Sequence, residues 1–288
     1  MAVKFFGQFL VEKNLVSREA LLKAIELQDE KNLKFGEMAI SMGYVTQADI
    51  EKAHNAQMSK DLKLGDLLVE MGILTGDQMN EVFTRQKSTH LYIGEALVLV
   101  GALDNEKLQS YLDEFKADQA LYVSDRIELP GGIADNLIWE MTADLTYKMI
   151  TRVLDLQFRP GKCRTVSSID SSFMMAAMDF SGDVEARYII SVSKSVQKLV
   201  AKAILHEESV DNEPAEVLED TVMEFVNVVC GNVAAKASQM GKIININPPE
   251  TIHPPAAGVP VPADCTGLSF PIHLGDDKSM ELILFVKN

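Results

Sequence analysis

The order of hydrophobic and polar residues divides the chain into two parts with different periods. Through residues 1–119 apolar positions recur at helical spacing, and the whole arrangement returns every 29 residues. Three of the four segments read FGQFLVEKNLVSREALLKAIELQ, FGEMAISMGYVTQADIEKAHNAQ and LGDLLVEMGILTGDQMNEVFTRQ. Each segment predicts a short helix followed by a longer amphipathic one. This part is therefore predicted to be an all-α array of four helical hairpins, each too small to bury its apolar face alone.

Turn and capping residues recur with the same period. Gly43, Gly72 and Gly101 suit the left-handed residue that closes a short helix, and Asn14 holds the same place in the first segment. The N-caps expected for the longer helices are Ser17, Thr46, Thr75 and Asp104. The longer helices end near Gln28, Gln57, Gln86 and Phe115. The glycines that open the segments, interpreted as backbone punctuation, are Gly7, Gly36, Gly65 and Gly94.

The second part has a mixed pattern. Residues 120–132 are predicted to be a linker because they end in Pro130-Gly131-Gly132, and residues 133–288 form a further domain. Helices are predicted over 134–154, 193–208 (capped by Ser193) and 213–241. Strands are predicted over 171–182, 185–193, 242–252, 267–275 and 279–287. The fold class is thus α+β, with an antiparallel sheet covered on one face by long helices.

The helix predicted over 213–241 carries a polar stripe that its burial does not require. Asp220, Glu224, Asn227 and Gly231 follow at i, i+4, i+7 and i+11, which places them within an arc of roughly 40–60°. The apolar face opposite is made by Val222, Phe225, Val226 and Val229. The stripe is therefore a candidate contact surface for a partner.

Composition excludes several classes of function. The formal net charge is −15, shared as −6 over residues 1–119 and −9 over the rest, so both parts would repel a nucleic acid. Three scattered cysteines and five histidines show no disulfide framework and no metal-ligand spacing. No apolar run is long enough for membrane insertion, and the N-terminus lacks the pattern of a signal peptide. A cytoplasmic protein with reduced thiols is expected.

No nucleophile–base set and no phosphate-binding loop is visible. An enzyme of this sequence would act by positioning. An amide can hold an attacking water in line, while a nearby acid pairs with a lysine on the substrate, which brings its own phosphate and metal. Phosphoryl transfer suits such a split site because it depends mainly on positioning and electrostatics.

The spacing of Asp220, Glu224 and Asn227 resembles the signature of the CheC/CheX/FliY family of chemotaxis phosphatases. That signature is Asp or Ser, three residues, Glu, two residues, Asn, and a proline about twenty-two residues on. Here Pro248 and Pro249 follow after 20 and 21 intervening residues, slightly short of the pattern, and Gly231-Asn232 matches a Gly-Asn pair of relatives. The resemblance covers roughly residues 125–288 and is greatest to the CheX branch, in which one helix carries a site.

The resemblance implies an aspartyl-phosphate phosphatase, a hydrolase that acts on a CheY-like response regulator in chemotaxis or two-component signalling. Glu224 would pair with the lysine of the receiver, Asn227 would orient the hydrolytic water, and Asp220 and Gly231 would contact the partner. No cofactor of its own is implied, because Mg²⁺ comes with the phosphorylated receiver. The resemblance also implies a possible homodimer formed through sheet edges. A partial copy of the motif, Asn136, Glu140 and Ala143, lacks the amide and is interpreted as inactive.

The 29-residue segments resemble the N-terminal module of the GspE/MshE family of secretion and pilus ATPases. In one branch, motifs that open with Arg-Leu-Gly bind cyclic di-GMP. Lys34 and Lys63 stand at two of the arginine positions, which keeps the charge without the planar fork that reads a guanine edge. A protein-docking or spacer role is therefore favoured over nucleotide binding.

Two alternatives remain open at this stage. In the first, the chain is a non-catalytic scaffold or sensor that sequesters a phospho-receiver while its repeats bind cyclic di-GMP or a motility or secretion ATPase. In the second, it is an adaptor that recognises receivers irrespective of phosphorylation. Binding of cyclic di-GMP, and the affinity for both receiver forms, discriminate between these hypotheses and the phosphatase.

Overall fold

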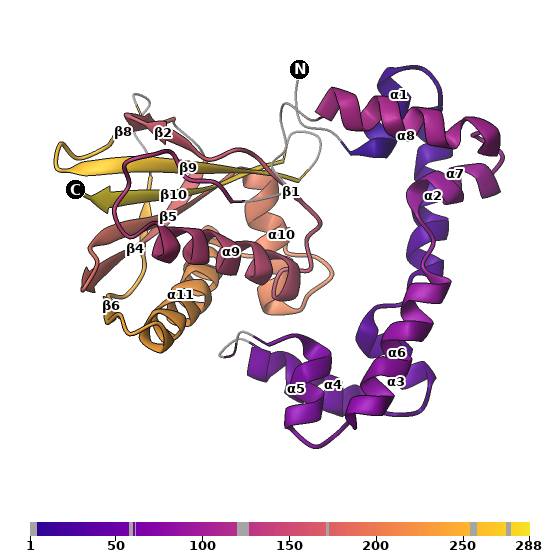
Figure 1. Cartoon of the computed structure of the whole chain (residues 1–288), viewed down its shortest axis with the longest axis horizontal. Coiled ribbons are helices and arrows are strands. Elements are labelled where there is room, and N and C mark those ends of the chain that lie inside the picture. The colour runs from indigo at the N-terminus through magenta and orange to yellow at the C-terminus, as the bar shows by residue number, and fades with distance from the viewer. Residues whose placement is uncertain are drawn as a thin grey trace. The chain divides into compact units, whose positions relative to one another are not determined.

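The computed structural model describes residues 5–57, 60, 62–119, 127–170, 173–253, 258–274 and 278–288. The chain forms two compact units, Met1–Leu121 and Tyr122–Asn288 (Figure 1). Residues 120–126 of the predicted linker lie outside the described residues. No helix of the described part is long and apolar enough to cross a membrane.

The described residues of the N-terminal unit form helices that alternate between short and long. The short helices are α1 (Phe6–Glu12), α3 (Phe35–Ser41), α5 (Leu64–Glu70) and α7 (Ile93–Leu99). The long helices are α2 (Arg18–Lys31), α4 (Gln47–Gln57), α6 (Gly76–Thr89) and α8 (Asn105–Gln119). Each short helix ends at the expected left-handed residue, with φ of 56° at Asn14 and 69–74° at Gly43, Gly72 and Gly101. The hydroxyls of Ser17 and Thr75 accept cap bonds from the amides of Ala20 and Gln78, as predicted.

Neighbouring helix pairs do not all stack in chain order. One apolar core joins α1 and α2 to α7 and α8, and a second joins α3 and α4 to α5 and α6. The buried residues of the first core are Phe6, Phe9, Leu10, Val16, Ala24, Ala96, Leu97 and Phe115. The first helix pair is thus completed by the fourth, and the second by the third.

The glutamines near the ends of the long helices join the paired elements. Gln57 Nε2 donates to the carbonyl of Leu62 at 2.9 Å, and Gln86 Nε2 donates to that of Leu33 at 2.9 Å. Gln28 Nε2 donates in the same way to Leu91 at 3.0 Å. Each accepting carbonyl precedes a short helix by two residues, so the glutamine fixes how a partner helix begins.

The interpretation of the opening glycines as backbone punctuation is wrong. None of Gly7, Gly36, Gly65 and Gly94 has a positive φ. Each lies at the start of a short helix where a Cβ atom would crowd a side chain fourteen residues on. A Cβ atom at Gly94 would lie 2.7 Å from Leu108 Cδ1, and one at Gly36 would lie 3.2 Å from Ile50 Cδ1. Close helix packing, and not a special backbone conformation, accounts for these glycines.

The described part of the C-terminal unit is α+β, as predicted. Its helices are α9 (Asn136–Arg152), α10 (Lys194–Leu205) and α11 (Ala215–Gln239). The long strands are β4 (Met174–Gly182), β5 (Ala186–Val192), β9 (Cys265–His273) and β10 (Ser279–Lys287). The short strands are β1 (Arg159–Pro160), β2 (Arg164–Val166), β3 (Ser168–Ile169), β6 (Ile244–Ile246), β7 (Glu250–Ile252) and β8 (Val259–Pro260).

All of these strands except β3 and β8 build an antiparallel sheet in the order β1-β9-β10-β5-β4-β6, with β2 on β9 and β7 on β4. Strands β3 and β8 pair with each other in a separate two-stranded sheet. The strand predicted over 242–252 is two strands, β6 and β7, because Pro248 and Pro249 interrupt the pairing with β4. The short strands β1, β2, β3 and β8 were not predicted, since two or three residues give no periodic signal.

The helices α9, α10 and α11 pack on one face of the sheet (Figure 1). Tyr188 of β5 is fully buried on this face, and its hydroxyl lies 3.1 Å from Thr146 Oγ1 of α9. The opposite face is also covered in part. A small apolar cluster there contains Met175, Ala177, Ile189, Ile283 and Phe285 together with Ile169 of β3. The sheet is therefore a rigid support for the helices, buried over much of both faces.

Candidate functional site

The site predicted from the sequence lies on α11. This helix starts after Pro214, and it ends at Met240 before Gly241, whose φ of 79° closes it. Val222, Phe225, Val226 and Val229 are completely buried, as the pattern predicts. Because this face packs on the sheet, the orientation of the helix about its own axis is fixed.

The opposite stripe faces solvent. Asp220, Glu224 and Asn227 are exposed, and Gly231 is half-buried. Asn227 Nδ2 lies 3.4 Å from Glu224 Oε2, a long hydrogen bond across one helical turn. The amide and the carboxylate are therefore adjacent, and both are open to a molecule that approaches this face of the C-terminal unit.

Gly231 extends the stripe as a small, open position. A Cβ atom at this residue would meet no other atom within 4 Å. The packing of the chain itself therefore does not explain a glycine in the middle of this helix. The neighbouring Asn232 has a different place: it is buried and donates from Nδ2 to the carbonyl of Val228 at 2.8 Å. The second half of the Gly-Asn pair is thus a structural residue.

The segment that contains Pro248 and Pro249 runs along one flank of α11. Thr251 Oγ1 lies 3.3 Å from Met223 Sδ, and His253 Nε2 lies 3.6 Å from Glu219 Oε2. Met223 and Glu219 are displaced by roughly 60–100° about the helix axis from the polar stripe. The proline segment therefore borders the stripe without covering it.

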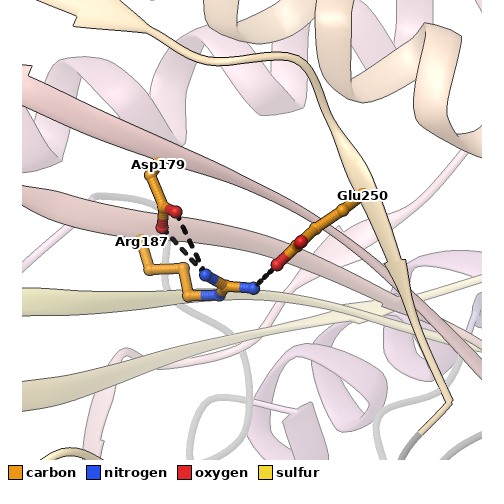
Figure 2. A network of polar contacts seen from close by, with 3 residues as sticks. All are labelled: Asp179, Arg187 and Glu250. Atoms are coloured by element: carbon orange, nitrogen blue, oxygen red, sulfur yellow. Dashed lines mark hydrogen bonds and ion pairs between the residues drawn. The ribbon is translucent and has the colours of Figure 1, made fainter.

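A three-residue ionic network holds this segment in place (Figure 2). Arg187 of β5 donates from Nη1 to both carboxylate oxygens of Asp179 on β4, at 3.0 and 3.2 Å. Its other terminal nitrogen, Nη2, pairs with Glu250 of β7, directly after Pro249. Since Arg187 bridges strands of the sheet to β7, it fixes the border of the exposed stripe.

Sequence reasoning missed this network. Asp179 and Arg187 are directly opposite each other in the β4–β5 register, so a hairpin alignment would have paired them. Glu250 lies 63 residues from Arg187 and gives no local signal.

The partial copy of the motif on α9 has a different environment. Ala143 stands where α11 has the amide, and it is completely buried. Asn136 is exposed and Glu140 is half-buried. The structure therefore places no exposed amide beside Glu140 at the equivalent position.

No group of three or more histidine, cysteine, aspartate or glutamate side chains in the described part of the chain is placed to hold a metal ion. Cys163, Cys230 and Cys265 are free thiols, and Cys230 is completely buried. Burial raises the pKa of the Cys163 thiol to about 12 and also raises that of Cys230. These two thiols are consequently uncharged at neutral pH.

Comparison with known proteins finds similarity for part of the C-terminal unit. A family model described as chemotaxis phosphatase CheX matches residues 174–273. The CheY-P phosphatase CheX of Thermotoga maritima is 25% identical over 143 residues, which is 49% of this chain and 90% of that protein.

The solved structures that resemble the chain include two chemotaxis proteins. CheX from Desulfovibrio desulfuricans is 16% identical, with a TM-score of 0.46, over 52% of this chain and 99% of that protein. The CheX-CheY-BeF3-Mg²⁺ complex from Borrelia burgdorferi is 21% identical, with a TM-score of 0.46, over 52% of this chain and 98% of the matched one.

Proposed function

Because its C-terminal part is a CheX-like domain, we propose that this protein is an aspartyl-phosphate phosphatase for a CheY-like receiver. The observation that carries the proposal is the exposed pair of Glu224 and Asn227 on α11. Both residues belong to the polar stripe predicted from the sequence, and both are exposed, so a folded partner can contact them.

The chemistry assigned to Asn227 is the orientation of water. A carboxamide donates and accepts hydrogen bonds at once, so it can hold a water molecule in line with the phosphorus–oxygen bond of an acyl phosphate. Attack by this water transfers the phosphoryl group to the water oxygen, and the aspartate carboxylate leaves. Mg²⁺ comes with the receiver and neutralises the charge on the phosphate.

The chemistry assigned to Glu224 is docking. Its carboxylate lies one turn from Asn227 and can pair with a lysine of the receiver, which fixes the angle at which the phosphate meets the amide. Asp220 would add a further acidic contact one turn earlier, and Gly231 would allow the backbone of the partner to approach closely. The proline segment, held by Arg187, borders this surface.

Asn227→Ala tests the assignment. The purified full chain is mixed with a phosphorylated CheY-like receiver and Mg²⁺, and loss of phosphate is followed with time. We expect the variant to lose about 100-fold or more of the rate, because the in-line water is no longer held. Asn212→Ala, a change of an exposed asparagine just before α11, is the matched control and should retain the wild-type rate.

The outcomes separate the alternatives. An Asn227→Ala rate equal to that of the wild type means that Asn227 is not the catalytic amide. Tight binding of phospho-receiver by a wild-type chain that shows no hydrolysis would instead support the non-catalytic scaffold. Equal affinity for both receiver forms would support the adaptor.

We also infer that residues 1–119 comprise four copies of one helical hairpin, which form a docking module. The support is the equivalence of contacts at the same place in different repeats. Gln57 and Gln86, one repeat apart, make the same bond to the start of a partner helix. Gly36 and Gly94, two repeats apart, both pack against a side chain fourteen residues on. Lys34 and Lys63 stand where the nucleotide-binding motif that these segments resemble has arginine. Heat released on addition of micromolar cyclic di-GMP would favour nucleotide binding over protein docking.

A further inference from the structure

The described part of the C-terminal unit contains a groove to which no residue of the α11 stripe contributes. Its volume is about 510 Å³, and one wall is a face of α9. The other walls come from Ile127 and Glu128, from Pro160, Gly161 and Cys163 of the β1–β2 segment, and from Phe270 of β9. Phe270 is almost completely buried, so its ring forms an apolar floor.

The α9 wall alternates apolar and acidic side chains along one helix face. Leu137, Glu140, Met141, Asp144 and Tyr147 follow at i, i+3, i+4, i+7 and i+10, and all of them line the groove. This stripe is about 15 Å long at 1.5 Å per residue. Leu137 is 70% exposed, so its side chain is accessible to a partner that enters the groove.

The groove is lined by charged side chains that are all acidic. Its lining residues include three carboxylates and no cationic side chain. Asp144 pairs with Lys148 at 2.7 Å, but across the described ranges no cation pairs with Glu128 or Glu140. Burial raises the pKa of Tyr147 well above its usual value and that of Cys163 to about 12, so neither adds charge at neutral pH.

We propose that this groove is a docking site for a basic peptide segment of another protein, with a large apolar side chain between lysines or arginines. The apolar residue would pack on Leu137, Met141 and Phe270, and its cationic neighbours would pair with Glu128 and Glu140. An extended segment rises about 3.3 Å per residue, so four to five residues span the stripe. A second copy of this acidic chain is disfavoured, because its net charge of −15 would repel the same carboxylates.

The test uses the full chain and a fluorescent peptide of sequence KKLKKLK, with binding followed by anisotropy. Two matched peptides isolate the two parts of the recognition: KKSKKSK keeps the charge, and EELEELE keeps the leucines. We expect KKLKKLK to bind about tenfold or more tightly than either. Equal binding of KKLKKLK and KKSKKSK would overturn the proposal, as would no binding of KKLKKLK up to roughly millimolar concentration.

Paired variants then locate the site. The double variant Glu128→Lys/Glu140→Lys should weaken KKLKKLK binding by about tenfold or more. The control variant Glu207→Lys/Glu208→Lys makes the same change of net charge at exposed residues elsewhere in the unit. It should change the affinity for KKLKKLK by less than about twofold. Equal losses in the two variants would mean non-specific attraction and would also overturn the proposal. Glu128→Gln/Glu140→Gln removes the charges without adding cations and repeats the test with less disturbance of the fold. Because the readout is direct binding, the result does not depend on phosphatase activity.

Discussion

At Gly231, the residue that would best stabilise the helix differs from the residue that would best allow a partner to approach. Glycine in the middle of a helix costs conformational entropy relative to alanine, and nothing in the chain lies close enough to require it. Gly231→Ala should therefore raise the free energy of unfolding by about 0.5–1 kcal/mol, as measured by urea denaturation. A loss of stability would show that the position is packed more closely than the structure indicates.

The same substitution at Gly267 is the matched contrast. A Cβ atom there would lie 2.7 Å from the carbonyl oxygen of Val166 and 2.6 Å from Val261 Cγ2, so Gly267→Ala should destabilise the protein by about 1 kcal/mol or more.

The Gly231→Leu variant separates the effect on folding from the effect on docking of the receiver. It should be as stable as Gly231→Ala yet raise the KM for phospho-receiver, and an unchanged KM would remove Gly231 from the docking surface.

The exposure of the α11 stripe could be predicted at the residue scale because it follows from local periodicity. Once Val222 and Phe225 face the sheet, Glu224 and Asn227 have to face solvent. The ion pair between Arg187 and Glu250 could not be predicted in this way. It depends on where β7 returns to the sheet, and the two residues are 63 positions apart in the chain.

At the scale of elements, the glutamines of the N-terminal unit act between helix pairs. Gln86→Ala should destabilise this unit by about 1 kcal/mol or more, because the carbonyl of Leu33 loses its donor in a partly buried place. Gln109→Ala is the control, since the Gln109 side chain donates to Asp113 at the exposed surface of α8. Thermal unfolding of both variants measures the difference, and equal melting temperatures would mean that the bond to Leu33 contributes nothing.

The element boundaries show what a sequence can specify. Helices predicted over 134–154 and 213–241 are observed at Asn136–Arg152 and Ala215–Gln239, because caps and apolar spacing are local signals. The pairing of the first helix pair with the fourth was not predicted. All four pairs have similar apolar faces, so the pattern alone does not say which faces meet.

At the scale of the whole molecule, each unit has apolar cores of its own. The two clusters of the N-terminal unit lie between Phe6 and Phe115, and the outer-face cluster of the sheet lies between Ile169 and Phe285. The charge is likewise divided, at −6 and −9, so neither part neutralises the other. Each of these three cores is thus formed within one unit.

We therefore expect residues 127–288, expressed alone, to fold and to dephosphorylate a receiver at the rate of the full chain. Calorimetry should show two transitions in the full chain, one of them within about 3 °C of the melting temperature of the fragment, since the outer-face cluster of the sheet lies wholly within the fragment. A control fragment of residues 1–119 should reproduce the other transition and show no hydrolysis. Two results would contradict this expectation: a single cooperative transition in the full chain, or a 127–288 fragment that folds but hydrolyses the phosphate much more slowly. Either would mean that the helical unit supports the α11 surface directly. Docking of the receiver would then have to be assigned to both units.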